Sequence, residues 1–380
     1  VFTAALTTSG FSVATAGTSD TAGNVYVVGY ADSSFTATAQ AAQKVFGGGT
    51  RDVVVTKYSP TGTVLWATYL GGTGDEYGRS IQLDGSGNVI ISGETSSKDF
   101  PTAGTPYQSS NKGQTDAFVA KLNSTGSQLV FSTYLGGTNF DSVRDIILDA
   151  SGNILIGGFT SSTDFPTAGS TVLQSTFRGV EDIFIAKLNS TGGQLLFSTY
   201  FGGTGYDEIV SMRLDNQGNI YLGGWTTSST LTATSGAAQT TLGGQSDNLV
   251  VKLNPTATAV QMLTYLGGSQ SDSPKGLTVA PDGSAIWLAG FTYSSNFPTT
   301  ANALQKTSAG DMDATIVKFD SQGALLASTY MGGTGQDEAD SVILRNGLPT
   351  VFLVLTTDVY NKAAAAEAIP TLREATTAPT

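Results

Sequence analysis

The chain has 380 residues, a net charge of -12 from 30 acidic and 18 basic side chains, and neither cysteine nor histidine. The missing cysteines exclude disulfides and thiolate chemistry, and the missing histidines exclude the commonest general base and transition-metal ligand. The acidic balance argues against a nucleic-acid partner, and the apolar runs are too short for membrane insertion. Abundant threonine, serine and glycine suit an extracellular or cell-surface protein in its mature, exported form.

One phrase returns five times along the chain and sets the length of a repeat. Thr68-Tyr69-Leu70-Gly71-Gly72 and its copies place tyrosines at 69, 134, 200, 265 and 330, in steps of 65 or 66 residues. A fixed long period indicates one structural unit copied in series. Because each unit packs only on its neighbours, a long chain can fold without one oversized core.

Each repeat is expected to contain four short strands. In the unit from Gly136 to Gly203, we expect strands at 143–148, 154–159, 182–188 and 194–200, with Asp, Gly and Asn at the turns. The strands are apolar on both faces, which is typical of a propeller blade enclosed by two others. No helix period occurs inside the repeat, which argues against helical solenoids.

Several motifs recur together in fixed order: Asp149-Ala-Ser-Gly-Asn-Ile, Gly158-Phe-Thr, Asp164-Phe-Pro-Thr, Asp182-Ile-Phe-Ile-Ala-Lys-Leu-Asn and Ser198-Thr-Tyr-Phe-Gly-Gly. This pattern resembles the bacterial SBBP repeat, a beta-propeller repeat, over nearly the whole chain. The resemblance implies an exported bacterial propeller that is often joined to other surface domains. It supplies no catalytic residues, and the usual family name implies seven blades.

The two ends of the chain read as complementary parts of one more blade. Phe2 to Leu6 stands in the register of a fourth strand, while 339–344 and 349–355 read as a first and a second strand. We therefore predict a six-bladed propeller of four-stranded antiparallel blades, closed by pairing of the N-terminal strand with the C-terminal blade. A seventh blade, the alternative, would need one more repeat. The third strand of the sixth blade is either supplied by Ile369 to Glu374 or missing, in which case the blade has only three strands.

The predicted propeller covers residues 1–358. Its blades are 8–70, 71–135, 136–201, 202–266 and 267–331, with a split blade from 1–7 and 334–358. Residues 359–380 read as a linker-like tail toward a further domain or partner.

An acidic residue follows the second connector glycine by four positions in five copies: Glu76, Asp141, Asp207, Asp272 and Asp337. In a propeller these acids would stand near the mouth of the channel, where Ca²⁺ or a water network would offset their repulsion. The alternative is that each carboxylate caps backbone N–H groups of its own connector. No other cofactor is indicated.

Three further polar positions repeat in register, and we expect each to have a structural role. Acids that precede a lysine by five residues should form hydrogen bonds within the blade: Asp52, Asp116, Asp182, Asp247 and Asp313. Acids of the first hairpin should shape its turn rather than bind calcium: Asp20, Asp84, Asp149 and Asp215. Glutamines of the long loops should anchor those loops: Gln43, Gln108, Gln174, Gln239 and Gln305.

The position six residues after the turn asparagine differs from copy to copy. It holds Tyr30, Glu94, Phe159, Trp225, Phe291 and Leu355, and it borders the long loops. Aromatic rings beside Ser, Thr and Asp side chains could stack on sugars and bind their hydroxyls. The alternative is packing between blades.

The function that these features favour is a non-catalytic extracellular module for binding or adhesion, which presents loops to a glycan, a surface polymer or a protein. One alternative is self-assembly into a surface layer or filament. A second alternative is a polysaccharide lyase or glycosidase that uses Glu94 with Glu76 or Asp75, because Glu94 breaks the repeat symmetry.

Overall fold

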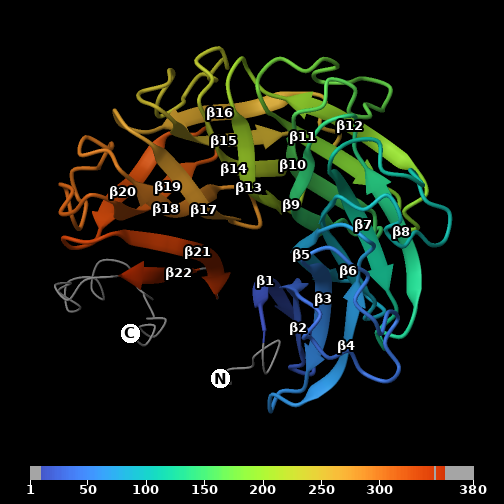
Figure 1. Cartoon of the computed structure of the whole chain (residues 1–380). Helices are drawn as coiled ribbons and strands as arrows, with labels where there is room; N and C mark the ends of the chain where they lie inside the picture. Colours follow the sequence, from blue (N-terminus) through green and yellow to red (C-terminus); the bar gives the residue numbers. More distant parts are fainter. Residues whose placement is uncertain (1–9, 346–347, 356–380) are drawn as a thin grey trace. The chain divides into compact units, whose positions relative to one another are not determined.

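The computed structural model describes residues 10–345 and 348–355, which form five four-stranded antiparallel sheets and one two-stranded sheet. Within each sheet the strands neighbour one another in chain order (Figure 1). These residues include no helix, and hence none long and apolar enough to span a membrane. The prediction of an all-β chain built from four-stranded antiparallel repeats is therefore confirmed.

The chain divides into two compact units. One unit takes Val1–Phe177 and Ile183–Tyr200, and the other takes Arg178–Asp182 and Phe201–Thr380. The boundary therefore falls where the third sheet gives way to the fourth. A single closed domain over residues 1–358 stays a prediction.

The first three sheets follow the expected blade boundaries. The first contains β1 (Ser12–Ser19), β2 (Val25–Ala31), β3 (Asp52–Tyr58) and β4 (Val64–Leu70). The second contains β5 (Glu76–Leu83), β6 (Val89–Thr95), β7 (Asp116–Leu122) and β8 (Leu129–Leu135). The third contains β9 (Asp141–Leu148), β10 (Ile154–Thr160), β11 (Asp182–Leu188) and β12 (Leu195–Phe201).

The remaining sheets repeat this order until the last, which has two strands among the described residues. The fourth contains β13 (Asp207–Leu214), β14 (Ile220–Thr226), β15 (Asp247–Leu253) and β16 (Val260–Leu266). The fifth contains β17 (Asp272–Val279), β18 (Ala285–Thr292), β19 (Asp313–Asp320) and β20 (Leu325–Met331). The sixth pairs β21 (Asp337–Arg345) with β22 (Leu348–Leu355). The predicted closing strand at Phe2 to Leu6 and the tail at 359–380 lie outside the described residues.

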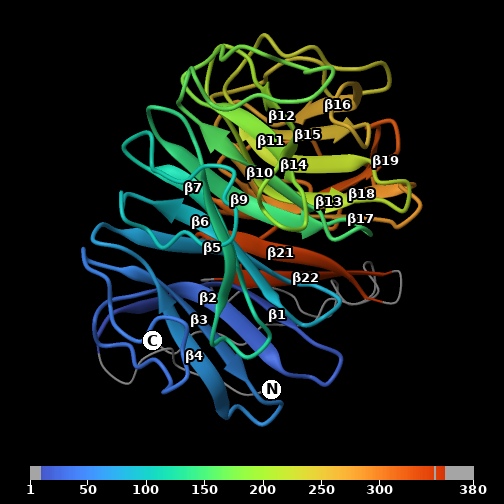
Figure 2. The ribbon, with the colours of Figure 1, turned by 90° about the vertical axis from the view of Figure 1, so that its right-hand side faces the viewer.

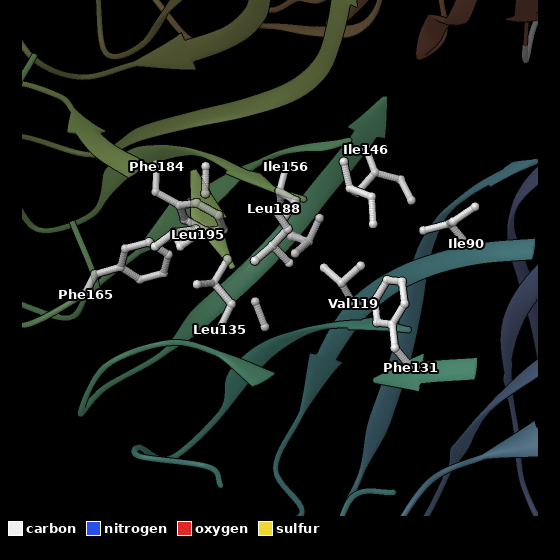
Figure 3. Close-up of a cluster of buried hydrophobic side chains, with 14 of the residues drawn as sticks. Ile90, Val119, Phe131, Leu135, Ile146, Ile156, Phe165, Phe184, Leu188 and Leu195 are labelled. Carbon is white, nitrogen blue, oxygen red and sulfur yellow. The ribbon is translucent and has the colours of Figure 1, made fainter. Parts of the chain in front are cut away.

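Within each unit, the first strand of a sheet lies against the first three strands of the sheet before it. In the first unit β5 lies on β1 to β3 and β9 on β5 to β7, and in the second β17 lies on β13 to β15 and β21 on β17 to β19 (Figure 2). Figure 3 shows the resulting core, in which Ile90 and Val119 of the second sheet share a cluster with Ile156 and Phe184 of the third. Each such side chain stabilises the fold by roughly 1.5–3 kcal/mol, which explains why these strands are apolar on both faces.

The tyrosine of the repeat phrase ties the outer strand to the long loop. Its side chain is buried in all five copies. The hydroxyl of Tyr134 donates to Ser97 O at 3.0 Å, and that of Tyr265 donates to Ser228 O at 2.8 Å. A buried hydroxyl needs such a partner, so the phrase fixes both the end of a blade and the start of its loop.

Candidate binding face

The connector acids are enclosed within their own connectors. None of the five is exposed to solvent: Glu76, Asp141, Asp207, Asp272 and Asp337. In Glu76, Oε2 accepts a hydrogen bond from Gly72 N at 3.0 Å. Its Oε1 accepts from the hydroxyls of Thr95 at 2.6 Å and Ser97 at 2.5 Å. The second connector glycine donates to the acid in the other four copies too, at 2.7–2.8 Å.

This geometry is the one that the capping alternative predicts. Within residues 10–345 and 348–355, no three Asp or Glu side chains gather into a group that could hold a metal ion. A channel-mouth Ca²⁺ site at these acids therefore stays a prediction.

A second buried acid faces each connector acid across the first connector glycine. These acids are those predicted to bond within the blade: Asp52, Asp116, Asp182, Asp247 and Asp313. A Cβ placed on Gly71 would lie 2.4 Å from Asp52 Cγ and 2.5 Å from Glu76 Oε2, so only glycine fits between the two carboxylates. Asp52 Oδ2 accepts from Gly47 N at 2.7 Å, which confirms a structural role.

Burial raises the pKa of several of the paired acids. Asp52 Oδ1 is buried and accepts no hydrogen bond. Burial raises the pKa of Asp52 to about 7; the Gly47 amide opposes the rise, and the charge of Glu76 adds to it. Burial likewise raises the pKa of Asp141 and of Asp272 to about 6, against the hydrogen bonds that these carboxylates accept. Asp52, Asp141 and Asp272 therefore keep their protons to a higher pH than an ordinary aspartate does.

The in-register glutamines anchor the long loops, as the sequence predicted. Gln108 Nε2 donates to Asp116 Oδ2 at 2.6 Å, and Gln108 Oε1 accepts from Gly136 N at 3.1 Å. Gln239 makes the same bonds to its own acid and glycine, at 2.6 and 3.0 Å. The loop that joins the second and third strands is therefore fixed to the outer strand and the connector.

The lysine of the third strand pairs with the acid of the first hairpin. Lys121 Nζ lies 2.7 Å from Asp84 Oδ2, and Lys187 Nζ lies 2.7 Å from Asp149 Oδ2. Asp84 also accepts from Asn88 N at 2.9 Å, as its predicted role in the turn requires. Burial opposes the charge of Asp84, but the hydrogen bonds from Lys121 and Asn88 outweigh it and lower the pKa to about 2. Lysine and turn acid lie in separate motifs of the sequence, and the pairing of the second and third strands brings them together.

The variable position of the second strand is aimed by a glycine and a bulge. We call its members the aromatic row, although one of them is a glutamate: Tyr30, Glu94, Phe159, Trp225 and Phe291. The glycine before each member approaches the first strand closely; a Cβ on Gly93 would lie 1.8 Å from Tyr77 O. A β-bulge interrupts the first strand just after this contact, between Gly78 and Ser80. Since bulges re-aim side chains, the backbone sets the direction of the row residue whatever its type.

The sequence placed the sixth member of this series one residue too late. In the other sheets the row residue pairs with the residue after the connector acid, as Trp225 pairs with Glu208. In the last sheet Glu338 pairs with Val354, and Leu355 pairs with the connector acid Asp337. The prediction of Leu355 was wrong because the last hairpin is one residue shorter.

Trp225 and Phe291 line one groove of about 510 Å³ in the second unit. It lies between the sheet of β13–β16 and the sheet of β17–β20. The rest of its lining is Thr227, Gln245, Ser246, Ser271, Ser273 and Tyr293. Tyr293 is 39% exposed and stands edge-on to Phe291, with ring centroids 5.8 Å apart. None of these side chains is charged, so the groove offers aromatic surface beside neutral donors and acceptors.

Backbone hydrogen bonds hold the walls of this groove. Asp272 N donates to Ser246 O at 2.9 Å, and Tyr293 N donates to Ser271 O at 3.0 Å. The hydroxyl of Ser271 donates to Gln245 Oε1 at 3.3 Å, which links the two sheets at the rim. The sequence identified the two row aromatics but not Tyr293 or the serines. Ser246, Ser271 and Tyr293 immediately precede or follow strands, and Ser273 is the second residue of β17. Only the packing of two sheets brings them together.

In the first unit, the row residues are joined through cross-strand neighbours. The rings of Tyr30 and Tyr77 lie 5.0 Å apart, and the Arg79 guanidinium lies 5.3 Å from the Tyr77 ring. Arg79 also binds Glu94, with Nη2 2.5 Å from Oε1 and Nε 3.3 Å from Oε2. The hydroxyl of Ser142 donates to Glu94 as well. Polar and aromatic contacts therefore run from the first sheet to the third.

Phe159 matches the packing alternative better than a ligand contact. It is 5% exposed and stacks on Phe140, with ring centroids 5.7 Å apart. The Arg144 guanidinium covers the same ring at 4.8 Å. Each of the two hypotheses for the row therefore fits one residue. Phe159 is enclosed by neighbouring side chains, as packing between blades predicts, while Trp225 lines an open groove, as ligand binding predicts.

The carboxylate of Glu94, the residue that breaks the repeat symmetry, is buried and bound by neighbouring side chains. The residue is 3% exposed, and its carboxylate is bound by Arg79 and Ser142. Glu76 is capped inside its connector, and Asp75 Oδ1 accepts from Thr50 N at 2.6 Å. A glycosidase or lyase needs a carboxyl group that is free to exchange a proton with its substrate, and the bonds of these three carboxylates are internal.

Comparison with known families identifies the repeat. Residues 65–101 and 196–231 match the model of the SBBP beta-propeller repeat. The first stretch begins in β4, crosses the connector and continues through β5 and β6 into the long loop. The SBBP identification made from the recurring motifs is confirmed, and the chain carries SBBP beta-propeller repeats.

One curated relative is the regulatory protein FlaEY of Caulobacter vibrioides. It is 26% identical over 258 residues, which cover 63% of this chain and 26% of that protein. The chain thus spans about a quarter of the length of this relative. Neither the SBBP match nor this relative indicates catalysis.

Three solved structures show weak overall similarity. The WD40 domain of Neurospora crassa Pan2 has a TM-score of 0.42 at 10% identity, covering 90% of this chain and 86% of that chain. A polysaccharide lyase, the PL25 ulvan lyase, scores 0.43 at 11% identity, covering 86% and 70%. The acylaminoacyl peptidase of Pyrococcus horikoshii scores 0.41 at 11% identity, covering 90% and 44%. Scores of this size carry no argument about shared activity.

Proposed function

Since the chain carries SBBP beta-propeller repeats, we propose that it is a non-catalytic binding module of the cell surface that takes a glycan on the aromatic row. The observation that carries this proposal is the groove in which Trp225 and Phe291 lie among neutral polar side chains. Sugars present an apolar ring face and many hydroxyls, and they are bound by aromatic rings beside hydrogen-bonding groups. The absence of charge in the lining favours a neutral sugar at this site.

A panel of neutral oligosaccharides, measured by titration calorimetry, tests the proposal. Trp225→Ala should weaken binding about ten-fold or more, because stacking on an aromatic ring contributes on the order of 1 kcal/mol beyond the area that it buries. Tyr107→Ala, which removes a ring 37% exposed in the first unit, is the matched control and should leave the affinity unchanged. Binding that survives Trp225→Ala, or no binding at all, would refute the groove as a glycan site.

The same titration distinguishes the groove from the predicted calcium site. The groove lining contains no carboxylate, so EDTA should leave sugar binding unchanged. Loss of binding with EDTA and its recovery with Ca²⁺ would instead support the connector acids.

A specific observation favours self-assembly as a second candidate function. In four of the five outer strands the second residue is an exposed aliphatic: Leu65 at 49%, Val130 at 43%, Leu196 at 38% and Leu326 at 48%. Outer strands also have one unpaired edge, which can pair with another chain. Light scattering that shows growth of particles with concentration, and its loss in Leu65→Lys, would support assembly. A monomer at every concentration would exclude it.

We further propose that the sheets are blades of a six-bladed propeller whose sixth blade is completed by residues 2–6. The support is the presence of five four-stranded sheets and one two-stranded sheet, each repeating the same order. Deletion of residues 1–7 should then lower the unfolding temperature sharply, because it would remove the strand that closes the sixth blade. An unchanged unfolding temperature would contradict closure by this strand.

A further inference from the structure

An arginine without an acidic partner lies among three aromatic rings in the first unit. The Arg51 guanidinium carbon is 4.8 Å from the Tyr77 ring centroid and 5.6 Å from those of both Phe11 and Tyr30. These rings belong to two neighbouring sheets. Cation–π contacts favour a fixed position of the charge, so the guanidinium is held in place rather than free in solvent. We call this group the arginine cluster: Phe11, Tyr30, Arg51 and Tyr77.

Among the described residues of the first unit, no carboxylate pairs with the Arg51 guanidinium. Within the part of the chain that the structure describes, this guanidinium donates one hydrogen bond, from Nε to the hydroxyl of Thr50 at 3.2 Å, and forms no ion pair. Arg79, its neighbour across Tyr77, instead binds Glu94 through two nitrogens. A guanidinium has five N–H donors in a planar fork, so Arg51 retains most of them for an external acceptor.

Asp52 and Glu76, which adjoin Arg51 and Tyr77 in the sequence, are buried. The two carboxylates next closest in sequence accept hydrogen bonds from the backbone. Asp75 Oδ1 accepts from Thr50 N at 2.6 Å and from its hydroxyl at 2.9 Å. Asp32 Oδ2 accepts from Phe11 N at 2.8 Å. These bonds hold the two segments that frame Arg51, and they direct both acids at amides rather than at the guanidinium.

We propose that the arginine cluster binds the carboxylate of a uronic-acid residue in an acidic saccharide. The planar fork of Arg51 matches a carboxylate in a bidentate pair, and Phe11, 49% exposed, offers a ring face to the sugar. The cluster occupies the same register as the groove of the second unit, between successive sheets, but differs from it in charge. This inference rests on the proposed glycan-binding function and names the class of sugar that the first unit takes.

Tetragalacturonate and its methyl ester form a matched pair of probes, because the ester removes the charge and keeps the rings. We expect the wild-type protein to bind the acid at least ten-fold more tightly than the ester, because the ester cannot form the charged bidentate pair with the guanidinium. Arg51→Gln should abolish this preference. Arg51→Lys, which keeps the charge but loses the fork, should retain only part of it. Arg178→Gln, which removes an exposed arginine of the second unit, should leave it unchanged.

A preference for the acid that persists in Arg51→Gln overturns the inference, and so does a wild-type protein that binds acid and ester equally or binds neither. If neutral oligosaccharides still bind in a manner sensitive to Trp225→Ala, the groove of the second unit stands and only the arginine cluster fails. Loss of both shows instead that the proposed glycan function is wrong.

Discussion

The paired acids predict that this protein loses stability as the pH rises from about 4 to about 7. Asp52 is the clearest case, because its Oδ1 has no partner and Glu76 faces it across Gly71. Burial raises its pKa from 3.8 to about 7. Between these values the folded chain holds a proton that the unfolded chain has released, so unfolding becomes more favourable as the pH increases. Below pH 4 both states are protonated, and the full stability is present.

The size of the effect follows from the shift. A change from 3.8 to about 7 corresponds to roughly 4 kcal/mol of stability lost between pH 4 and pH 8. Asp141 and Asp272, whose pKa values are raised to about 6, act in the same direction. The turn acid Asp84 acts oppositely: its pKa is lowered to about 2, so its contribution is present above pH 4 and is lost below it. Between pH 4 and pH 7 the raised acids therefore dominate.

Asp52→Asn tests this reasoning, because it removes the charge and keeps the shape. Urea unfolding should show the variant more stable than the wild type at pH 8, by up to about 4 kcal/mol, and equal to it at pH 4. Asp84→Asn removes the same charge from a paired carboxylate and should be destabilised at pH 8, which controls for the net charge of -12. A constant difference between Asp52→Asn and the wild type at both pH values would refute the argument.

Two further substitutions test the connector and the loop anchor. Gly71→Ala should destabilise the fold by about 1–3 kcal/mol, because the new Cβ would meet Asp52 and Glu76. Gly85→Ala, whose Cβ would have nothing within 4 Å, should leave the stability unchanged. Equal urea midpoints for the two variants would contradict this packing. Tyr134→Phe should lower the free energy of unfolding by about 1 kcal/mol and speed proteolysis of the long loop, since the hydroxyl donates to Ser97 O. An unchanged rate of cleavage in limited trypsin digestion would argue against this anchor.

The strands and the repeat could be read from the sequence because their signals are local. The phrase at Thr68 to Gly72 fixed the period, and the apolar runs between turn residues marked the strands. Side-chain contacts between different sheets could not be predicted from such local patterns. Arg51 meets rings from residues 11, 30 and 77, and no spacing in the sequence relates these positions. Similarly, Asp52 and Glu76 were recognised as repeated acids, but their contact across Gly71 depends on how the connector crosses the third strand.

The glycine and bulge that aim the aromatic row suggest a use for this chain as an engineering scaffold. Since the backbone, not the side chain, determines where the row residue points, a row residue that is only partly buried can be exchanged with less effect on folding than the enclosed Phe159. Randomising Tyr30 and Tyr77, or Trp225 and Phe291, would then vary recognition on a constant frame. Each pair of sheets carries its own row residues, so one molecule could display several specificities, assembled from interchangeable copies of a single module.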